Sequence, residues 1–116
     1  MNINTEESIL KNQIKKYFNF IKKKKFDKLE ALFNNKITLH DGKLRILGKK
    51  NLINFTEGIF LLETFKIQNQ IIILNKKHKI AFSRFNLKLK NKNYKIIDEF
   101  YFDKDFKISK IIVYKF

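Results

Sequence analysis

Three polar residues, Tyr17, Asp41 and Asp98, are set among apolar side chains in a pattern that favours burial. Tyr17 falls on the apolar stripe of an amphipathic helix, and Asp41 alternates with Ile37 and Leu39 along one side of a strand. Asp98 lies in a strand-like stretch in which both sides are apolar. Because burial disfavours a charged carboxylate, we expect raised pKa values for both aspartates. Such groups in a cavity are candidates for acid–base chemistry.

Each of these residues also has a purely structural explanation. Asp41 precedes Gly42, and aspartate is common where a strand ends in a turn. An aromatic residue on a helix stripe, such as Tyr17, often packs in the core with its hydroxyl at the rim. A buried acid such as Asp98 needs a partner wherever it points. Asp41 is the best single candidate for a role in the cavity.

Other kinds of site are not expected. His40 and Asp41 are adjacent, so in a strand they point to opposite faces and cannot line one cavity together. His40 and His78 share no metal-binding motif, and the chain has no cysteine. The glycines form neither a Walker nor a GxGxxG pattern. We therefore expect no metal ion and no cofactor, nucleotides included.

Helical spacing dominates the first half of the chain. Thr5 is placed to cap a first helix, and two glutamates in its first turn favour the positive end of the helix. The elements predicted for this half are a helix over 5–23, a short second helix before a turn at 34–35, strands over about 37–41 and 44–47, and a third helix within 51–60.

The second half changes to long stretches rich in isoleucine and phenylalanine, typical of strands. Short polar turns join them and suit antiparallel hairpins better than helical crossovers. Helices first and an antiparallel sheet second indicate an α+β domain, with the helices packed across one face of a strongly curved sheet. The predicted strands cover about 64–74, 79–90, 94–102 and 107–115.

The chain has 116 residues, the length of one domain, and we expect a single domain over 1–116. Apolar residues make up 44% of it, which argues against disorder despite a formal net charge of +15. The longest apolar runs have four residues, far fewer than the ~20 of a membrane helix. The N-terminus lacks the basic and apolar regions of a secretory signal. We expect a cytoplasmic protein that does not enter the membrane.

The positive charge has a compositional explanation. Lysines outnumber arginines 24 to 2, whereas direct recognition of bases and phosphates often uses the bidentate fork of arginine. Lysine, isoleucine, asparagine and phenylalanine all have AT-rich codons, so codon bias accounts for the excess of lysine. Nucleic-acid binding is therefore the least favoured function.

Two segments and the order of the elements resemble a known family. The opening, QIKKYFNFIKKKKFDKLEALFNNKITLHDG, resembles the helix, short helix ending in Leu-Phe, and strand ending in Asp of SnoaL-like members of the nuclear transport factor 2-like superfamily. The close, IIDEFYFDKDFKISKIIVYKF, resembles their hairpin. The resemblance covers nearly the whole chain. It implies a cone-shaped barrel of N-terminal helices packed on a strongly curved, mainly antiparallel sheet, the cystatin-like α+β roll.

Within that superfamily, the nearest catalytic pattern is that of ketosteroid isomerase. The resemblance places Asp41 on its base, and Tyr17 and Asp98 on the two donors that hold the oxyanion. In such an enzyme the base takes a proton next to a carbonyl. The donors, one of them a carboxylic acid kept protonated by an apolar site, hold the enolate oxygen.

The sequence departs from its relatives at several positions. Gly42 stands where many relatives have proline, and Phe33 and Thr56 stand where some isomerases have supporting tyrosines, which argues against a steroid substrate. The Asp-Arg-Asp set of limonene-epoxide-hydrolase-like enzymes is incomplete, because Arg84 is followed two places later by Asn86.

These features predict an apolar pocket for a small apolar molecule. The function predicted for it is isomerase-like or cyclase-like proton transfer next to a carbonyl. The alternative is a non-catalytic ligand-binding or protein-interaction module of the same fold, because one fold hosts many functions. The resemblance also implies a homodimer. The predicted pocket lining is Ile37, Leu39, Phe85, Leu87, Phe100 and Phe102.

Overall fold

The computed structural model describes residues 5–116, and its elements follow the order predicted from the sequence. The side chain of Thr5, the predicted helix cap, lies outside the described part. The elements are α1 (Thr5–Lys22), α2 (Phe26–Glu30), β1 (Phe33–Asp41), β2 (Leu44–Leu47), α3 (Lys49–Phe60), β3 (Phe65–Asn75), β4 (Ile80–Leu89), β5 (Lys92–Phe102) and β6 (Ile108–Lys115).

The strands form one mixed sheet in the order β2-β1-β6-β5-β4-β3. From β3 to β6 the chain makes an antiparallel meander, as predicted. β1 pairs in parallel with β6 and antiparallel with β2, so the N-terminal strands extend the sheet beyond its last strand. The predicted α+β roll is confirmed, with a sheet that curves but does not close into a barrel.

Local backbone features shape the sheet. The register of β3 with β4 shifts between Gln68 and Ile71, where Asn69 has a φ of 57°. Such a bulge inserts one extra residue and bends its strand. At the next hairpin, Lys90 and Asn91 have φ values of 52° and 63°, the left-handed conformation that two-residue turns between twisted strands require.

The turn predicted at 34–35 was wrong, because β1 already begins at Phe33. Phe33 pairs with Ile108 of β6, and the Ile108 amide donates to the Leu32 carbonyl at 2.8 Å, so the chain enters the sheet directly from α2. The Asn34 side chain donates to Asp103 at 2.7 Å. The polar residue that suggested a turn instead ties β1 to the loop before β6.

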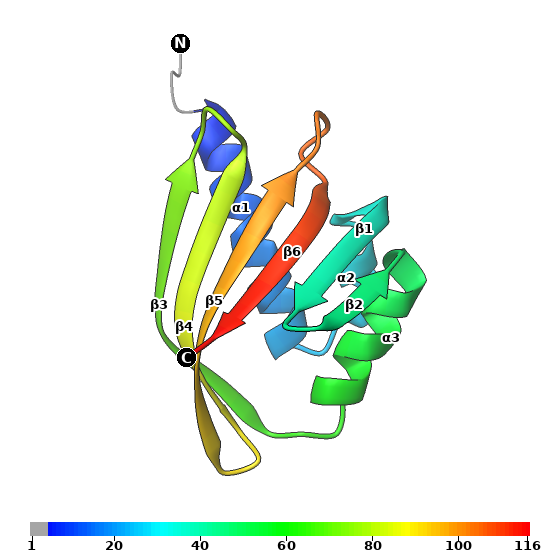
Figure 1. Ribbon diagram of the computed structural model, residues 1–116, viewed down its shortest axis with the longest axis vertical. Helices are drawn as coiled ribbons and strands as arrows, with labels where there is room; N and C mark the ends of the chain where they lie inside the picture. The colour runs from blue at the N-terminus through cyan, green and yellow to red at the C-terminus, as the bar shows by residue number, and fades with distance from the viewer. Residues whose placement is uncertain (1–4) are drawn as a thin grey trace.

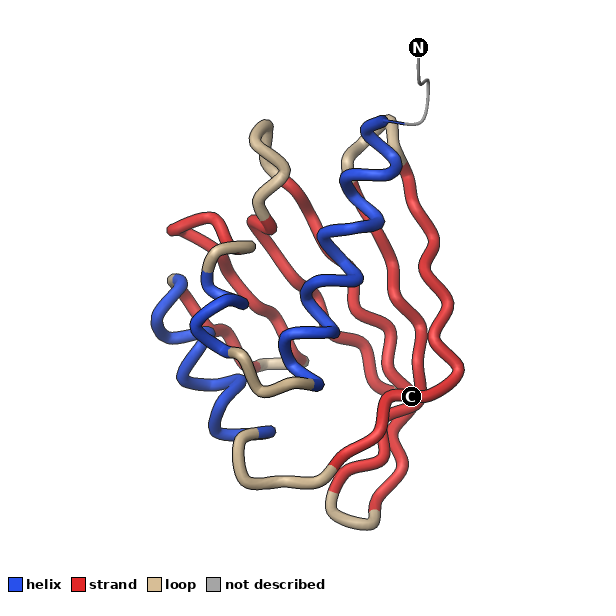
Figure 2. Tube along the Cα trace, turned by 180° about the vertical axis from the view of Figure 1, so that it is seen from behind, coloured by secondary structure: helices blue, strands red, loops and turns tan. Residues whose placement is uncertain are grey.

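All three helices of the described part lie on the same face of the sheet, and the other face carries no helix (Figures 1 and 2). α1 contacts β3 and β4, whereas α3 contacts β1 and β2, and α2 contacts both other helices. The core fills the space between helices and sheet, with Leu10, Ile14, Leu29, Ile37, Leu52, Phe100, Ile108 and Ile111 almost fully buried. Among residues 5–116, no helix is both long enough and apolar enough to cross a membrane.

Candidate functional site

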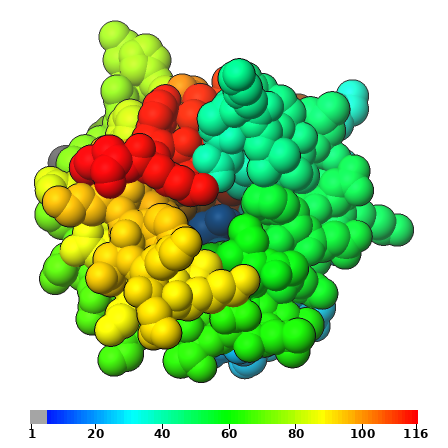
Figure 3. Space-filling view, turned by 60° about the horizontal axis from the view of Figure 1, so that its bottom comes forward, coloured from blue at the N-terminus to red at the C-terminus, as the bar shows by residue number. Residues whose placement is uncertain are grey.

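An apolar pocket of about 400 Å³ opens at one end of the molecule. Its mouth lies where β1 and β6 end and where the β4–β5 hairpin turns, with α3 on the remaining side (Figure 3). Side chains from α1 form its floor, visible at the bottom of the hollow. Most of the wall is aliphatic and aromatic. The polar side chains in the lining are Tyr17, Asp41, Thr56, Lys90, Tyr94, Asp98 and Lys115.

Strand register brings Asp41 and Asp98 to the same wall. Asp41 of β1 and Asp98 of β5 both pair with Val113 of β6, one from each side. Residues paired across strands point to the same face, so both carboxyl groups face the helices. Neighbouring strands lie about 4.8 Å apart, which puts the two backbones about 10 Å from each other.

Asp98 is buried, with 6% of its surface exposed. Burial, and then the charge of Asp41, raise the pKa of Asp98, Lys115 acts in the opposite direction, and the net result is a pKa of about 7. A carboxyl group with such a pKa is present in both protonation states near neutral pH. Asp98 can therefore donate or accept a proton at physiological pH.

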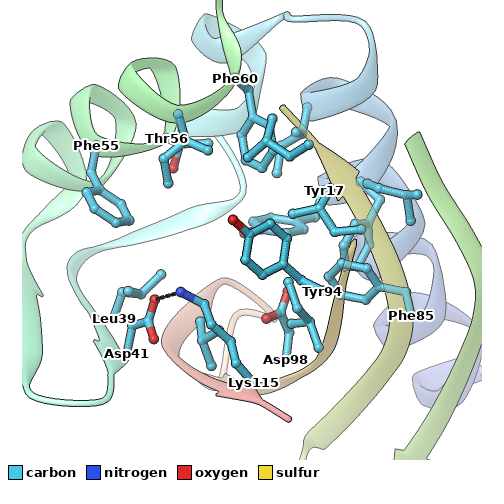
Figure 4. Close-up of a pocket in the computed structure, with 18 of the residues that line it drawn as sticks. Tyr17, Leu39, Asp41, Phe55, Thr56, Phe60, Phe85, Tyr94, Asp98 and Lys115 are labelled. Carbon is cyan, nitrogen blue, oxygen red and sulfur yellow. Dashed lines mark ion pairs between the residues drawn. The ribbon is translucent and has the colours of Figure 1, made fainter. Parts of the chain in front are cut away.

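Tyr17 and Asp98 line the same pocket, and Figure 4 shows the ring of Tyr94 between them. The ring of Tyr17 packs edge-on against Phe18 and Phe100, with centroids 5.0 and 5.1 Å away. Burial, and then the charge of Asp98, raise the pKa of Tyr17 well above its usual value, so its hydroxyl stays a neutral donor. No buried polar side-chain atom of the described residues lacks a partner, so the polar ends of Tyr17 and Asp98 meet the open pocket.

Asp41 forms an ion pair with Lys115, a residue that was not predicted from the sequence. Lys115 Nζ lies 3.0 Å from Asp41 Oδ2, and the two side chains are 52% and 22% exposed, which places this ion pair at the mouth (Figure 4). A signal was available, because Lys115 alternates with Val113 on β6 and therefore points to the same face. A terminal lysine in a lysine-rich chain did not stand out.

Two further polar residues in the wall were also missed. Thr56 is buried on α3 and its hydroxyl donates to the Leu52 carbonyl at 2.8 Å, so its oxygen can only accept from a ligand. Tyr94 lies on β5, four residues before Asp98, and strand alternation puts both on the pocket side.

The predicted lining was half right. Leu39, Phe85 and Leu87 line the pocket, as expected. Ile37, Phe100 and Phe102 do not, and this part of the prediction was wrong. They point to the same face of the sheet, but they lie further from the mouth, where the helices pack directly on the strands. Their exposed fractions there are 0%, 0% and 8%.

Other titratable residues lie away from the pocket. His40 points to the opposite side of β1 from Asp41, as predicted, and there burial and the charges of Arg45 and Lys110 lower its pKa. Arg84 is exposed on the outer side of β4, so it cannot contribute epoxide-hydrolase-like chemistry in this pocket. In the described part of the chain, no three potential metal ligands gather.

The helices, the curved sheet and the pocket define a nuclear transport factor 2-like fold. Similar solved structures include a nuclear transport factor 2-like protein of unknown function from Cytophaga hutchinsonii, with a TM-score of 0.80, 12% identity, and coverage of 92% of this chain and 89% of the other. A proposed polyketide cyclase from Sinorhizobium meliloti has a TM-score of 0.78 and 13% identity, and the match covers 89% of this chain and 94% of the other.

A limonene-epoxide-hydrolase-like epoxide hydrolase from M. tuberculosis has the same architecture, with a TM-score of 0.80 and 14% identity. The match covers 94% of this chain and 84% of the other. No family model and no curated protein matches this chain by sequence. The chain thus has the fold that its sequence resembled, that of the SnoaL-like and cystatin-like proteins.

Proposed function

We propose that this protein moves a proton next to the carbonyl group of a small, largely apolar substrate, in an isomerase-like or cyclase-like reaction. One observation carries the proposal: Tyr17, Asp41 and Asp98 come from three different elements and line one apolar pocket. The raised pKa of Asp98, about 7, fits a group that must be protonated to donate. Structural neighbours that are described as polyketide cyclases or as epoxide hydrolase/cyclase-like are compatible with the cyclase variant.

In the proposed reaction, the Asp41 carboxylate accepts a proton from the carbon next to the carbonyl. The electron pair of the broken C–H bond moves toward the carbonyl oxygen and forms an enolate. The Tyr17 hydroxyl and protonated Asp98 donate hydrogen bonds to that oxygen. Return of the proton to a different carbon gives an isomer. Alternatively, attack of the enolate carbon on a second carbonyl closes a ring, and the alkoxide formed from that carbonyl takes the proton back from Asp41 as a hydroxyl group.

Lys115 has a defined part in this scheme. Its ammonium lies 3.0 Å from the Asp41 carboxyl group, the proposed base. Because the lysine side chain is 52% exposed, it can turn toward water when a substrate displaces it. The resting ion pair is then a state that opens before proton transfer.

Exchange of substrate hydrogen for deuterium tests the proposal without knowledge of the product. Ketones are incubated with the protein in D₂O, and loss of the proton signal next to the carbonyl is followed by NMR. Asp41→Asn should slow exchange by ~100-fold or more, as expected for loss of a general base. Tyr17→Phe should slow it by ~10- to 1000-fold, through loss of one oxyanion donor.

Asp105→Asn is the matched control, because Asp105 is exposed in the loop after β5 and lies outside the pocket. This variant should exchange at the wild-type rate. A loss of less than tenfold in Asp41→Asn would show that Asp41 is not the base. An NMR titration of the Asp98 carboxyl that gives a pKa near 4 would remove the proposed acid donor.

Ligand binding without turnover is the second candidate function. The ion pair favours it, because Lys115 occupies the carboxylate that a reaction would need. In that case small apolar molecules bind in the pocket, and no ketone exchanges its proton faster than in the Asp41→Asn variant.

We also propose a homodimer that uses the outer face of the sheet. Ile71, Ile73 and Tyr114 are 52%, 58% and 46% exposed on that face, which no helix of the described part covers. Light scattering should give twice the chain mass. Ile73→Lys should lower it to the mass of one chain, whereas a single-chain mass for the wild type would refute the dimer.

A further inference from the structure

We propose that the ligand of this pocket is an amphipathic organic anion, with its apolar body inside and its carboxylate at the mouth between Lys115 and Lys90. This inference names the ligand class of the same pocket. Only the statement that the ligand is also the substrate rests on the proposed function. Binding itself can be tested without any turnover.

Two lysines stand at the mouth from separate elements. Lys115 ends β6, and Lys90 lies in the two-residue turn between β4 and β5. Both line the pocket, and their side chains are 52% and 64% exposed. Lys90 Nζ lies 4.0 Å from a Glu63 oxygen, a loose contact that leaves its ammonium available to a ligand.

The acidic groups of the pocket leave the mouth open to an anion. The charge of Asp41 is compensated by Lys115 at 3.0 Å. Asp98 is more deeply buried, with 6% of its surface exposed against 22% of the Asp41 side chain, and its raised pKa leaves a large neutral fraction at pH 7. Across the whole chain the formal net charge is +15, and such an excess draws small anions toward the surface.

The interior suits the apolar part of such a molecule. Leu39, Phe85 and Ile96 contribute apolar surface from the strands, and Phe18 contributes it from α1. A hydrocarbon body there loses contact with water, while a carboxylate at the mouth keeps its hydration and gains the two ammonium groups. For catalysis, the carbonyl of the substrate would lie inside near Tyr17, several bonds from the carboxylate. The substrate class is therefore an oxo acid with an apolar chain.

A pair of matched ligands tests the inference. Decanoate and decan-1-ol share one hydrocarbon chain and differ in the charge of the head group. Each is used to displace the neutral fluorescent probe N-phenyl-1-naphthylamine from the pocket at pH 7.5. The chain has no tryptophan, so the protein contributes little background fluorescence. We expect decanoate to bind at least fivefold more tightly than decan-1-ol at low salt.

Variants at the mouth should act on decanoate alone. The double variant Lys90→Gln and Lys115→Gln should lower the affinity for decanoate by roughly tenfold and leave the affinity for decan-1-ol unchanged. Lys104→Gln is the matched control, because Lys104 is exposed in the loop between β5 and β6 and lies outside the pocket lining. It should change neither affinity.

Asp41→Asn gives a result of opposite sign. Removing this carboxylate frees Lys115 and removes a negative charge, so decanoate should bind about threefold more tightly. The same substitution slows exchange by ~100-fold or more under the proposed function, so affinity and turnover move in opposite directions. If exchange fails while the affinity pattern holds, only the proposed function is wrong.

Three outcomes would overturn the inference. Equal affinities for decanoate and decan-1-ol would show that the lysines at the mouth contribute nothing to binding of the carboxylate. If Lys104→Gln lowered the affinity for decanoate as much as the double variant does, the preference for decanoate would come from the net charge of the protein and not from the two lysines at the mouth. Failure of both ligands to displace the probe would remove amphipathic chains as the ligand class.

Discussion

The inner face of the sheet has a closed end and an open end, although the same strands build both. The closed end comprises Ile37, Phe100, Phe102, Ile108 and Ile111, which are 0–8% exposed. The open end comprises Leu39, Asp41, Asp98, Val113 and Lys115, which surround the pocket. Strand alternation points both sets toward the helices, so their difference lies in what covers them.

At the closed end, Leu10 and Ile14 of α1 are fully buried and fill the space over the strands. At the open end α1 provides only the floor of the pocket, and α3 covers β1 and β2 instead. The closed end therefore holds the fold together. The open end keeps polar side chains in an apolar pocket, which lowers the stability of the fold. Functional sites commonly have this cost.

The largest predicted difference between the two ends concerns packing. Phe100→Ala should reduce the free energy of unfolding by about 3–5 kcal/mol, because a fully buried ring is lost from a packed region. Phe55→Ala, in the half-buried wall of the pocket on α3, should cost less than about 1.5 kcal/mol. Urea unfolding measures both. Equal costs would show that the open end is packed as tightly as the closed end.

The second prediction concerns the buried acid of the open end. The folded-state pKa of Asp98, about 7, lies above its ordinary value of 3.8, so the folded state binds the proton more tightly and stability falls as pH rises from about 4 to about 8. Asp98→Asn removes this loss. At pH 8 the variant should be more stable by up to about 4 kcal/mol, from roughly three pKa units at 1.36 kcal/mol each.

Thermal or urea unfolding at pH 4.5 and pH 8 measures the effect. The gain should be small at the lower pH, where wild-type Asp98 is already protonated. Asp105→Asn, at an exposed position, is the control and should show no such pH dependence. A constant difference between wild type and Asp98→Asn at both pH values would contradict the raised pKa.

The third and smallest prediction concerns Asp103, which lies beyond the closed end. Unlike that of Asp98, its carboxyl group accepts hydrogen bonds from neighbouring residues. Burial raises the pKa of Asp103, but hydrogen bonds from Asn34 and the amides of Lys107 and Asp105 outweigh it and lower the pKa overall. This stabilisation is present above about pH 4 and is lost as the pH falls through the folded-state pKa.

Asp103→Ala should therefore cost about 1 kcal/mol at pH 7, opposite in sign to Asp98→Asn, because it removes the acceptor of three hydrogen bonds, two of them exposed to water. The cost should be smaller at pH 2.5 than at pH 7, because protonation of the wild-type carboxyl sets in as the pH falls toward its lowered pKa. Chemical unfolding at the two pH values measures this. A variant as stable as wild type at pH 7 would show that these hydrogen bonds contribute nothing.

Much of the fold could be predicted because its signals are local. Apolar spacing predicted α1 to within one residue at its end and β2 at its observed bounds, and the polar turns predicted the meander. The turn at 34–35 was wrong, since pairing of Phe33 with Ile108 outweighed the turn preference of asparagine. That partner is 75 positions away in the chain, and no local pattern reports it.

By itself, the sequence determined that Tyr17, Asp41 and Asp98 lie among apolar side chains, since helical spacing and strand alternation are properties of the backbone. Tyr17 was singled out on its helix stripe and Asp41 on strand alternation, whereas Asp98 has apolar residues on both sides of its strand; all three line one pocket. Only the tertiary structure decided where the inner face is filled and where it stays open. It also brought Lys115 to Asp41, because β1 pairs with β6, and such contacts depend on chain packing rather than on spacing.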